Sequence, residues 1–207
     1  MSLDMKKTHK TLYAPSAKAV SVVDVPPLNY LMIDGAGNPN TAPRYTEAVV
    51  ALYKMAYGIR AISKADGEVF TVMPLEGLWT LDGEHDPNVL LTDADKDKFV
   101  WTLMIVQPEH VTAEMVDASR ENVAARKDAP ALLGEVRFET YHEGESVQQL
   151  HLGPYTSEGP TIAGLHDHIE ANGWSLGKPH HEIYLNDPRK VAPEKIKTVI
   201  RQPFDRQ

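Results

Sequence analysis

The order strand, helix, strand, strand occurs twice along this chain, and that internal repeat constrains the fold more than any other feature of the sequence. In each copy, apolar runs of strand length surround one stretch with apolar residues at helical spacing. Both copies end on the same two residues, at Gln107-Pro108 and at Gln202-Pro203. The strand runs are 29–37, 68–83 and 98–108 in the first copy and 146–155, 180–188 and 195–204 in the second, and the helical stretches are 44–62 and 161–174.

Two such units can join their strands into one antiparallel sheet with helices on one face. We therefore predict an α+β fold in which duplicated modules form a single domain over residues 1–207. The other face of the sheet, curved by its twist, is expected to form a ligand cleft between the modules. The predicted divisions are a flexible N-terminal tail (1–20), a first module (21–108), a connecting helix (109–130) and a second module (131–207).

Composition excludes several classes of function. The chain has no cysteine, so neither disulfides nor thiolate chemistry contribute. Its net charge is −8 and its basic residues are scattered, so we expect no nucleic-acid partner. No apolar run approaches the roughly 20 residues of a membrane helix. The first residues are polar and lack the apolar segment of a signal peptide, so a cytoplasmic protein is expected.

The strand at 180–185 carries an unusual polar face. Alternation places His180, Glu182 and Tyr184 on one side, and His181, Ile183 and Leu185 on the other. If the first face lines a cleft, Glu182 is a carboxylate among rings, and full burial would raise its pKa by up to ~3–5 units. Such a group can bind a cation, take a proton from water or protonate a ligand. The alternative is a solvated strand face with an ordinary salt bridge.

Further candidates for ligand contact are aromatic, acidic or imidazole side chains on predicted strands. Two tryptophans can form a wall for a flat ligand or simply pack in the core. Glu76 is the first-module counterpart of the Glu182 stretch, either as a second cleft carboxylate or as a solvent-facing residue. His151 is a ligand contact or a buried histidine with its hydrogen bonds satisfied. The full set is Trp79, Trp101, Glu76, Tyr155, His180, Tyr141 and His151.

The sequence indicates neither a metal nor a cofactor. His166 and His168 are two residues apart on a predicted helix and therefore point away from each other. Residues 93–98 begin like a calcium-binding loop, but Lys98 stands where that loop needs glycine and Met104 where it needs glutamate. No nucleotide-binding glycine motif and no nucleophile elbow occurs.

Several stretches, among them PPLNYLMIDGAGNPN, PLEGLWTLDG, FVWTLMIVQPE and HHEIYLNDPRKVAPEKIKTVIRQP, together resemble the GyrI-like small-molecule-binding family. The resemblance implies a duplicated strand–helix–strand–strand fold. Members of that family are drug-sensing domains of transcription regulators, a gyrase-inhibitory protein, and enzymes that hydrolyse cyclopropane rings in DNA-alkylating natural products. This chain shows no N-terminal helix-turn-helix pattern and is most similar to the standalone branch that includes the hydrolases. In the family, a glutamate on the penultimate strand points into an aromatic cleft, and the matching residue here is Glu182.

Two functions remain open from the sequence. In the first, the protein is a hydrolase in which Glu182 deprotonates a water that opens a strained ring. Tyr184 or Tyr155 then hydrogen-bonds the oxygen that gains charge, and Trp79 and Trp101 sandwich the aromatic plane. In the second, the protein is a sequestering or sensing module in which Glu182 is the counter-ion of a lipophilic cation. The expected partner is in either case a small hydrophobic or cationic aromatic ligand. A gyrase-interaction role is a weaker third option.

Overall fold

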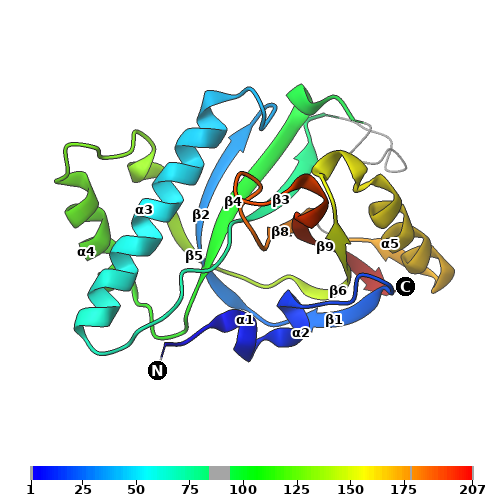
Figure 1. The fold of residues 1–207 in the computed structure, drawn as a ribbon, viewed down its shortest axis with the longest axis horizontal. Coiled ribbons are helices and arrows are strands. Elements are labelled where there is room, and N and C mark those ends of the chain that lie inside the picture. Colours follow the sequence, from blue (N-terminus) through cyan, green and yellow to red (C-terminus); the bar gives the residue numbers. More distant parts are fainter. Residues whose placement is uncertain (1, 84–93, 178, 207) are drawn as a thin grey trace.

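The computed structural model describes residues 2–83, 94–177 and 179–206. Within these residues, nine strands form one antiparallel sheet, and helices pack against it (Figure 1). The strands are β1 (Ser21–Val25), β2 (Leu28–Ala36), β3 (Glu76–Leu81), β4 (Phe99–Gln107), β5 (Arg137–Tyr141), β6 (Gly144–Leu152), β7 (Trp174–Leu176), β8 (His180–Tyr184) and β9 (Lys197–Arg206). The helices are α1 (Met5–Thr8), α2 (Lys10–Tyr13), α3 (Pro43–Ala65), α4 (Ala113–Ala124) and α5 (Gly159–Ala171).

The order of the strands confirms the predicted duplication. It is β1-β6-β9-β8-β3-β4-β2-β5, and β7 pairs separately with β9. The first module is therefore β2-α3-β3-β4, and the second is β6-α5-β8-β9 with β7 inserted after its helix. The modules join at the centre of the sheet, where β3 pairs with β8. There Gly77 lies opposite Glu182 and Trp79 lies opposite His180.

Each module also begins with a short strand that pairs with the other module. β1 precedes β2 along the chain but pairs with β6, so that Ser21 lies opposite Gln148. β5 precedes β6 but pairs with β2, so that Leu28 lies opposite Tyr141. The two edges of the sheet are thus completed by an exchange of leading strands, which the repeat pattern did not reveal.

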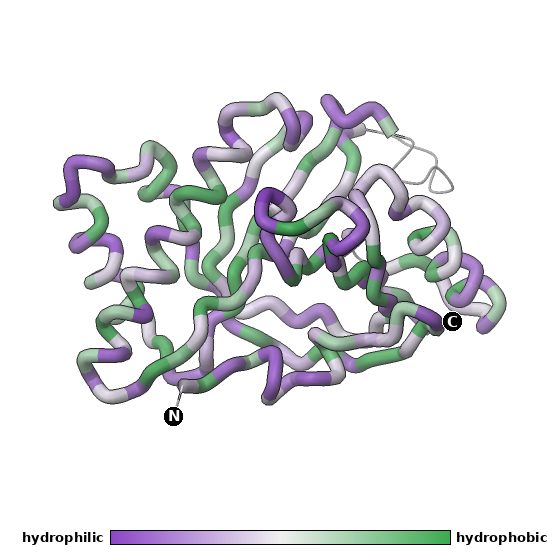
Figure 2. The backbone as a smooth tube through the Cα atoms, in the orientation of Figure 1, coloured by the Kyte–Doolittle hydropathy of each residue, from purple (hydrophilic) through white to green (hydrophobic). Residues whose placement is uncertain are grey.

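Helices α3 and α5 cover the same face of the sheet, each over the outer strands of its own module. Helix α3 starts at Pro43, whose fixed φ suits the first helical position. Its fully buried residues include Ala48, Leu52 and Met55, and those of α5 include Leu165. Figure 2 shows apolar residues gathered along the strands and hydrophilic ones concentrated in the peripheral loops. Helix α4, capped by Thr112, packs on α3 and lies in the segment predicted as a connecting helix.

Two expectations differ from the structure. The first is that the cleft lies on the face opposite the helices. The space between the modules instead lies on the helical face, because α3 and α5 stand apart and leave the central strands β3 and β8 uncovered between them (Figure 1). The second is that residues 1–20 form a flexible tail. Residues 5–13 instead form α1 and α2, whose side chains Met5, Leu12 and Tyr13 are buried.

None of the described helices combines the length and the apolar character needed to cross a membrane.

Candidate functional site

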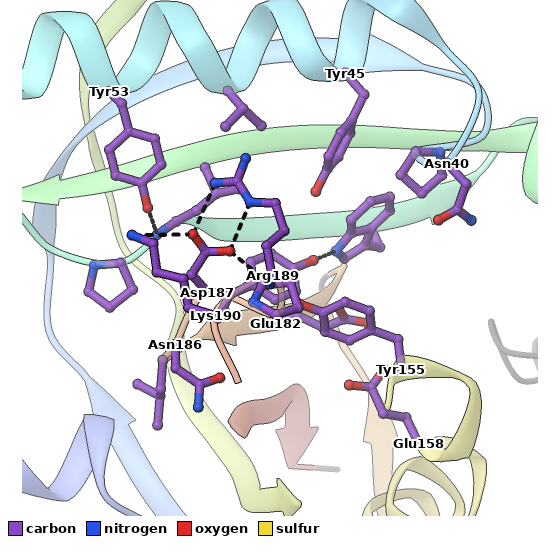
Figure 3. A pocket seen from close by; sticks show the side chains of 18 of the residues that line it. Asn40, Tyr45, Tyr53, Tyr155, Glu158, Glu182, Asn186, Asp187, Arg189 and Lys190 are labelled. Carbon is purple, nitrogen blue, oxygen red and sulfur yellow. Dashed lines mark hydrogen bonds and ion pairs between the residues drawn. The ribbon is translucent and has the colours of Figure 1, made fainter. Parts of the chain in front are cut away.

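A cavity of about 780 Å³ lies between α3 and α5, above the central strands. Its volume is within the range of sites for drug-sized molecules. Figure 3 shows Tyr45 and Tyr53 projecting into it from α3, and Tyr155 and Glu158 from the opposite side. Both modules therefore supply walls, and the strands supply the floor.

Glu182 projects from the centre of that floor. It lies on β8 with its side chain 15% exposed, and the strand alternation directs it toward the helical face with His180 and Tyr184. The residue opposite it on β3 is Gly77, which has no side chain to fill the space above the sheet. The Nε2 atom of His180 lies 3.4 Å from Glu182 Oε1. The floor thus presents one carboxylate at the junction of the modules, and a buried imidazole lies next to it.

Tyr184 links Glu182 to the aromatic wall. Its hydroxyl accepts a hydrogen bond of 3.1 Å from Trp79 Nε1, and it is also hydrogen-bonded to Glu182. Burial and the neighbouring Glu182 charge raise the pKa of Tyr184 well above its usual value. Because Trp79 donates a hydrogen bond to the Tyr184 oxygen, the hydroxyl of Tyr184 can donate to Glu182 and hold that carboxylate in place.

Aromatic rings form the walls around Glu182. Tyr45 stacks on Trp79 with ring centroids 6.2 Å apart and an angle of 27° between the planes. Tyr155 meets Tyr184 edge to face at 5.7 Å. Burial and the Glu182 charge raise the pKa of Tyr155 to about 12, so its hydroxyl remains a donor at neutral pH. The rings give a flat apolar ligand two surfaces to stack on, with hydroxyl groups at their edges.

A second carboxylate, Glu158, lies in the same cavity. It precedes α5, is only 3% exposed and lines the cavity wall. Burial, followed by the charge of Glu182, raises the pKa of Glu158 to about 9. Two carboxylates in one largely buried site do not both ionise readily, so Glu158 is neutral at pH 7. The cavity therefore contains one acid in the form that can donate a proton.

One loop at the rim of the cavity carries an acidic and two basic side chains. The side chain of Arg189 bonds Asp187 through Nε–H···Oδ1 at 2.9 Å, and Lys190 Nζ lies 3.6 Å from Asp187 Oδ2. The hydrogen bond from Arg189 holds the pKa of Asp187 well below its usual range. Asp187 is therefore neutralised by its own loop.

Trp101 does not line the cavity, contrary to the predicted sandwich of two tryptophans. It is 1% exposed, because it lies over Gly35, where a Cβ atom would come within 2.1 Å of the indole ring. Its Nε1 donates to the Gly37 carbonyl at 3.2 Å. Tyr45 packs edge to face on it at 5.3 Å and occupies the position expected for Trp101. Trp101 thus packs against Tyr45 and supports this part of the cavity wall without contacting the cavity.

Glu76 lies on the opposite face of the sheet from the cavity, because its partner on β8 is Ile183 rather than Glu182. It is fully buried and accepts from Tyr13 at 3.2 Å, and His181 Nε2 lies 3.1 Å from it. Tyr141 is on that face too, edge to face with Tyr30. Neither residue reaches the cavity.

His151 and His180 are on the helical face but do not line the cavity. His151 is 7% exposed and lies within hydrogen-bonding distance of Thr161 and Ser157, as expected for a satisfied buried histidine. Burial lowers its pKa. His180 is 5% exposed and contacts Glu182. Of the residues predicted from the sequence, the structure brings Glu182, Tyr184, Trp79 and Tyr155 together at the cavity.

The sequence reasoning missed Tyr45, Tyr53 and Glu158. The tyrosines belong to a series spaced by four residues along α3, Tyr45, Val49, Tyr53 and Tyr57, and all four line the cavity. That spacing was a signal, because a buried stripe rarely carries so many hydroxyl groups at its border. Glu158 gave no comparable signal, since it stands in a loop before a helix.

Among the described residues, no three His, Cys, Asp or Glu side chains are grouped so that they could hold a metal ion. The stretch with a calcium-like beginning starts at residue 93, which is outside the described residues.

The family model described as a GyrI-like small molecule binding domain matches residues 18–204. Three crystal structures from Listeria innocua are similar over 99% of this chain and 100% of theirs. One is an uncharacterized conserved protein at 38% identity and a TM-score of 0.87. The other two are of a hydrolase, at 37% and 38% identity with TM-scores of 0.82 and 0.84. No curated protein matches the chain.

Proposed function

Because this chain belongs to the GyrI-like small-molecule-binding family, we propose that it binds flat hydrophobic xenobiotics between α3 and α5 and hydrolyses strained electrophilic rings in them. The observation that carries the proposal is the position of Glu182, a carboxylate on the floor of a cavity walled by aromatic rings. A cyclopropane-bearing electrophile is the substrate class that fits this arrangement. In this role the protein is a cytoplasmic detoxifying enzyme.

Binding of the substrate rests on the aromatic walls. Tyr45 and Trp79 offer one stacking surface, and Tyr155 and Tyr184 offer another across the cavity. Removing a flat apolar molecule from water contributes about 25 cal/mol per Å² of buried surface. This orients the plane of the ligand and brings its reactive carbon over Glu182.

The chemical step needs a nucleophile, and Glu182 supplies it from water. A carboxylate acts as a general base when it is ionised and fixed in direction, and the hydrogen bond with Tyr184 fixes Glu182. A positioned general base contributes roughly 10²–10⁴ in rate. A strained ring needs little more than this and orientation. The hydrolase from Listeria innocua at 37–38% identity supports a hydrolytic role for this chain as well.

A second candidate is the binding of lipophilic cations without turnover. The same carboxylate surrounded by rings favours it, because a cation over an aromatic face gains from the ring quadrupole, and Glu182 would then be its counter-ion. The two candidates differ in the charge of the preferred ligand and in whether a product forms.

The test is incubation of the protein with a cyclopropane-bearing duocarmycin-type alkylator, with ring-opened product measured by mass spectrometry. We expect catalytic turnover by the wild type and a loss of about 10²-fold or more in Glu182→Gln, in which the ligand still binds. Glu194→Gln, an exposed residue outside the cavity, is the matched control and retains full turnover.

Binding without product would reject the hydrolase and favour the cation-binding role, provided that Glu182→Gln also weakens binding of a cationic dye. Equal turnover by the wild type and Glu182→Gln would show that the base is another residue.

A further inference from the structure

A carboxyl group in the cavity wall has one buried oxygen without a hydrogen-bond partner. The Oε1 atom of Glu158 is buried and has no hydrogen-bond partner among the described residues. The side chain lies at the start of α5, but it does not cap that helix. It points into the cavity instead, on the side that faces Glu182 (Figure 3). A charged carboxylate would leave this buried oxygen unpaired, so the position favours the protonated form of Glu158.

The surroundings of Glu158 hold it in its neutral form. Burial is the largest effect that disfavours the charged form of Glu158, and the carboxylate of Glu182 on β8 is the second largest. A hydrogen bond with Thr198 and the Lys96 ammonium lower the pKa of Glu158, but they do not overcome burial. The Glu158 charge also acts on two tyrosine hydroxyls, that of Tyr184 on β8 and that of Tyr155, three residues before Glu158 in the chain. Both are neutral phenols at pH 7, so they add no charge that would ionise Glu158.

We propose that Glu158 is the proton donor of this site, which protonates the substrate oxygen that gains negative charge as the ring opens. The inference rests on the hydrolysis proposed above and adds its second catalytic residue. It replaces the assumption that a tyrosine hydroxyl alone stabilises that oxygen. A carboxylic acid is a much stronger acid than the buried phenols Tyr155 and Tyr184, and can therefore transfer its proton completely.

Glu182 takes one proton from water while the water oxygen forms a bond to a ring carbon. The ring C–C bond breaks, and its electron pair moves through the conjugated system to the carbonyl oxygen. That oxygen takes the proton of Glu158 and becomes a phenol. Glu182 ends protonated and Glu158 ends ionised, so the pair keeps one negative charge throughout, and a proton passed between them through solvent restores the starting state.

This pair defines the substrate class more narrowly. The electrophile must be neutral and must carry an oxygen conjugated with the strained ring, on the side of the cavity formed by α5. A cation without such an oxygen offers Glu158 no atom to protonate. The pair therefore favours turnover of neutral carbonyl-conjugated rings over binding of simple cations.

The test compares wild type, Glu158→Gln and Glu182→Gln with the same alkylator across pH 5–10. We expect Glu158→Gln to bind the intact substrate normally and to lower kcat by roughly 10²-fold with little change in KM. We also expect the wild-type rate to fall above about pH 9, where Glu158 loses its proton, and this fall to be absent in Glu158→Gln. Glu170→Gln, exposed on the same helix, is the matched control and behaves as wild type.

The loss of kcat in Glu158→Gln can also be measured for a series of alkylators that differ in the acidity of the phenol formed. A purely structural role of Glu158 would give the same loss for every member of the series. If the ring-opened phenol is more acidic, the substrate oxygen carries its developing negative charge more stably and depends less on protonation. The loss of kcat in Glu158→Gln then becomes smaller. A constant loss across the series would overturn the proposal.

The outcomes separate the two proposals. Turnover that needs Glu182 but is unchanged in Glu158→Gln would overturn the role of Glu158 and leave the hydrolase intact. No turnover by the wild type would overturn both. A thermal melt of each variant shows whether the fold is kept, and we expect Glu158→Gln to melt no lower than wild type, because a neutral amide replaces a neutral acid.

Discussion

At the scale of single residues, one glycine gives the cavity floor its shape. The indole of Trp79 lies over Gly77, and a Cβ atom at residue 77 would come within 2.7 Å of Trp79 Nε1 and 3.3 Å of the Tyr184 hydroxyl. These two atoms form the hydrogen bond that holds the ring and, through Tyr184, Glu182. The lack of a side chain at Gly77 therefore leaves room for the arrangement of Trp79, Tyr184 and Glu182.

Gly77→Ala should displace the Trp79 ring and break its bond to Tyr184. We expect a loss of stability of about 1–3 kcal/mol from overpacking. We also expect ligand affinity to fall about tenfold, because an aromatic contact is worth about 0.5–1.5 kcal/mol. Tryptophan fluorescence during ligand titration measures both the ring environment and the affinity. Gly134→Ala, where a Cβ meets nothing within 4 Å, is the control and should bind as wild type. Normal affinity in Gly77→Ala would mean that the Trp79 position does not matter.

The sequence could indicate residues of the floor but not all those of the walls. Alternation along 180–185 correctly separates Glu182 from His181, because strand geometry is local. Glu76 was harder to assign, since its side depends on the register between β3 and β8, which sequence alone does not fix. Glu158 depends on where a loop returns to the sheet, and local patterns do not contain that information.

At the scale of elements, α2 is fixed to the sheet by buried polar groups on the face opposite the cavity. The Arg201 guanidinium donates to the Leu12 carbonyl at 2.8 Å, and Gln148 donates to the Thr11 carbonyl at 2.6 Å. The Tyr13 hydroxyl donates to Glu76. A helix of four residues has little stability of its own in water, so these bonds and the burial of Leu12 hold it. These bonds join residues far apart in the chain, so local sequence patterns do not reveal them. The N-terminal segment was therefore predicted to be a flexible tail.

Tyr13→Phe tests this attachment. The substitution removes one donor from the buried Glu76 carboxylate and keeps the ring, so the free energy of unfolding should fall by about 1–3 kcal/mol in urea denaturation. The matched control is Tyr57→Phe, since the Tyr57 side chain is largely exposed, and its stability should equal that of the wild type. A Tyr13→Phe protein as stable as the control would show that the hydroxyl is dispensable for attachment.

At the scale of the whole molecule, a buried ion network joins the two modules beneath the cavity. His181 Nδ1 lies 2.9 Å from Glu143, and Arg201 Nη1 donates to the same carboxylate at 2.9 Å. Burial alone would lower the pKa of His181, but Glu143 and Glu76 raise it to about 9. Burial alone would raise the pKa of Glu143, but His181 and Arg201 hold it at about 2.

These shifts predict a defined pH range of stability. The His181 contribution is complete below its ordinary pKa of 6.5 and is lost as pH rises through about 9. The Glu143 contribution is complete above 4.5 and is lost as pH falls through about 2. Because both shifts arise from one ion pair, we count them once, at about 3 kcal/mol. The free energy of unfolding, measured by denaturant titration across pH, should show this contribution in full between about pH 4.5 and 6.5.

Glu143→Gln isolates the network. It leaves Arg201 with an uncharged partner in a buried site and His181 with Glu76 as its one remaining carboxylate among the described residues, so we expect a loss of about 3–5 kcal/mol near pH 6. The difference from wild type should shrink toward pH 9. Glu145→Gln, two residues away in an exposed pair with Arg206, should leave the profile unchanged. Parallel profiles for wild type and Glu143→Gln would contradict the role of this pair.

The architecture was more predictable than its connections. The apolar periods and the repeated Gln-Pro step gave the fold class and the order of the long elements, because these follow from local patterns. The region 68–83 was predicted as one strand or as two strand segments interrupted at Pro74, and its strand in the structure is β3, Glu76–Leu81. The face that holds the cavity was predicted wrongly, because the separation of α3 and α5 depends on tertiary packing. The short strands β1 and β5 lie at the edges of the sheet and have too few residues for a clear pattern.

The exchange of leading strands has a consequence for how the chain folds. Ser21 and Gln148, which pair across β1 and β6, are 127 residues apart, so the sheet edge closes only after most of the chain has been ordered. Contacts of such long range slow folding. A chain cut within the connection around α4 would yield two fragments, each lacking an edge strand that the other carries. Neither fragment can finish its sheet alone, and the two should recover the native structure only by assembling around each other.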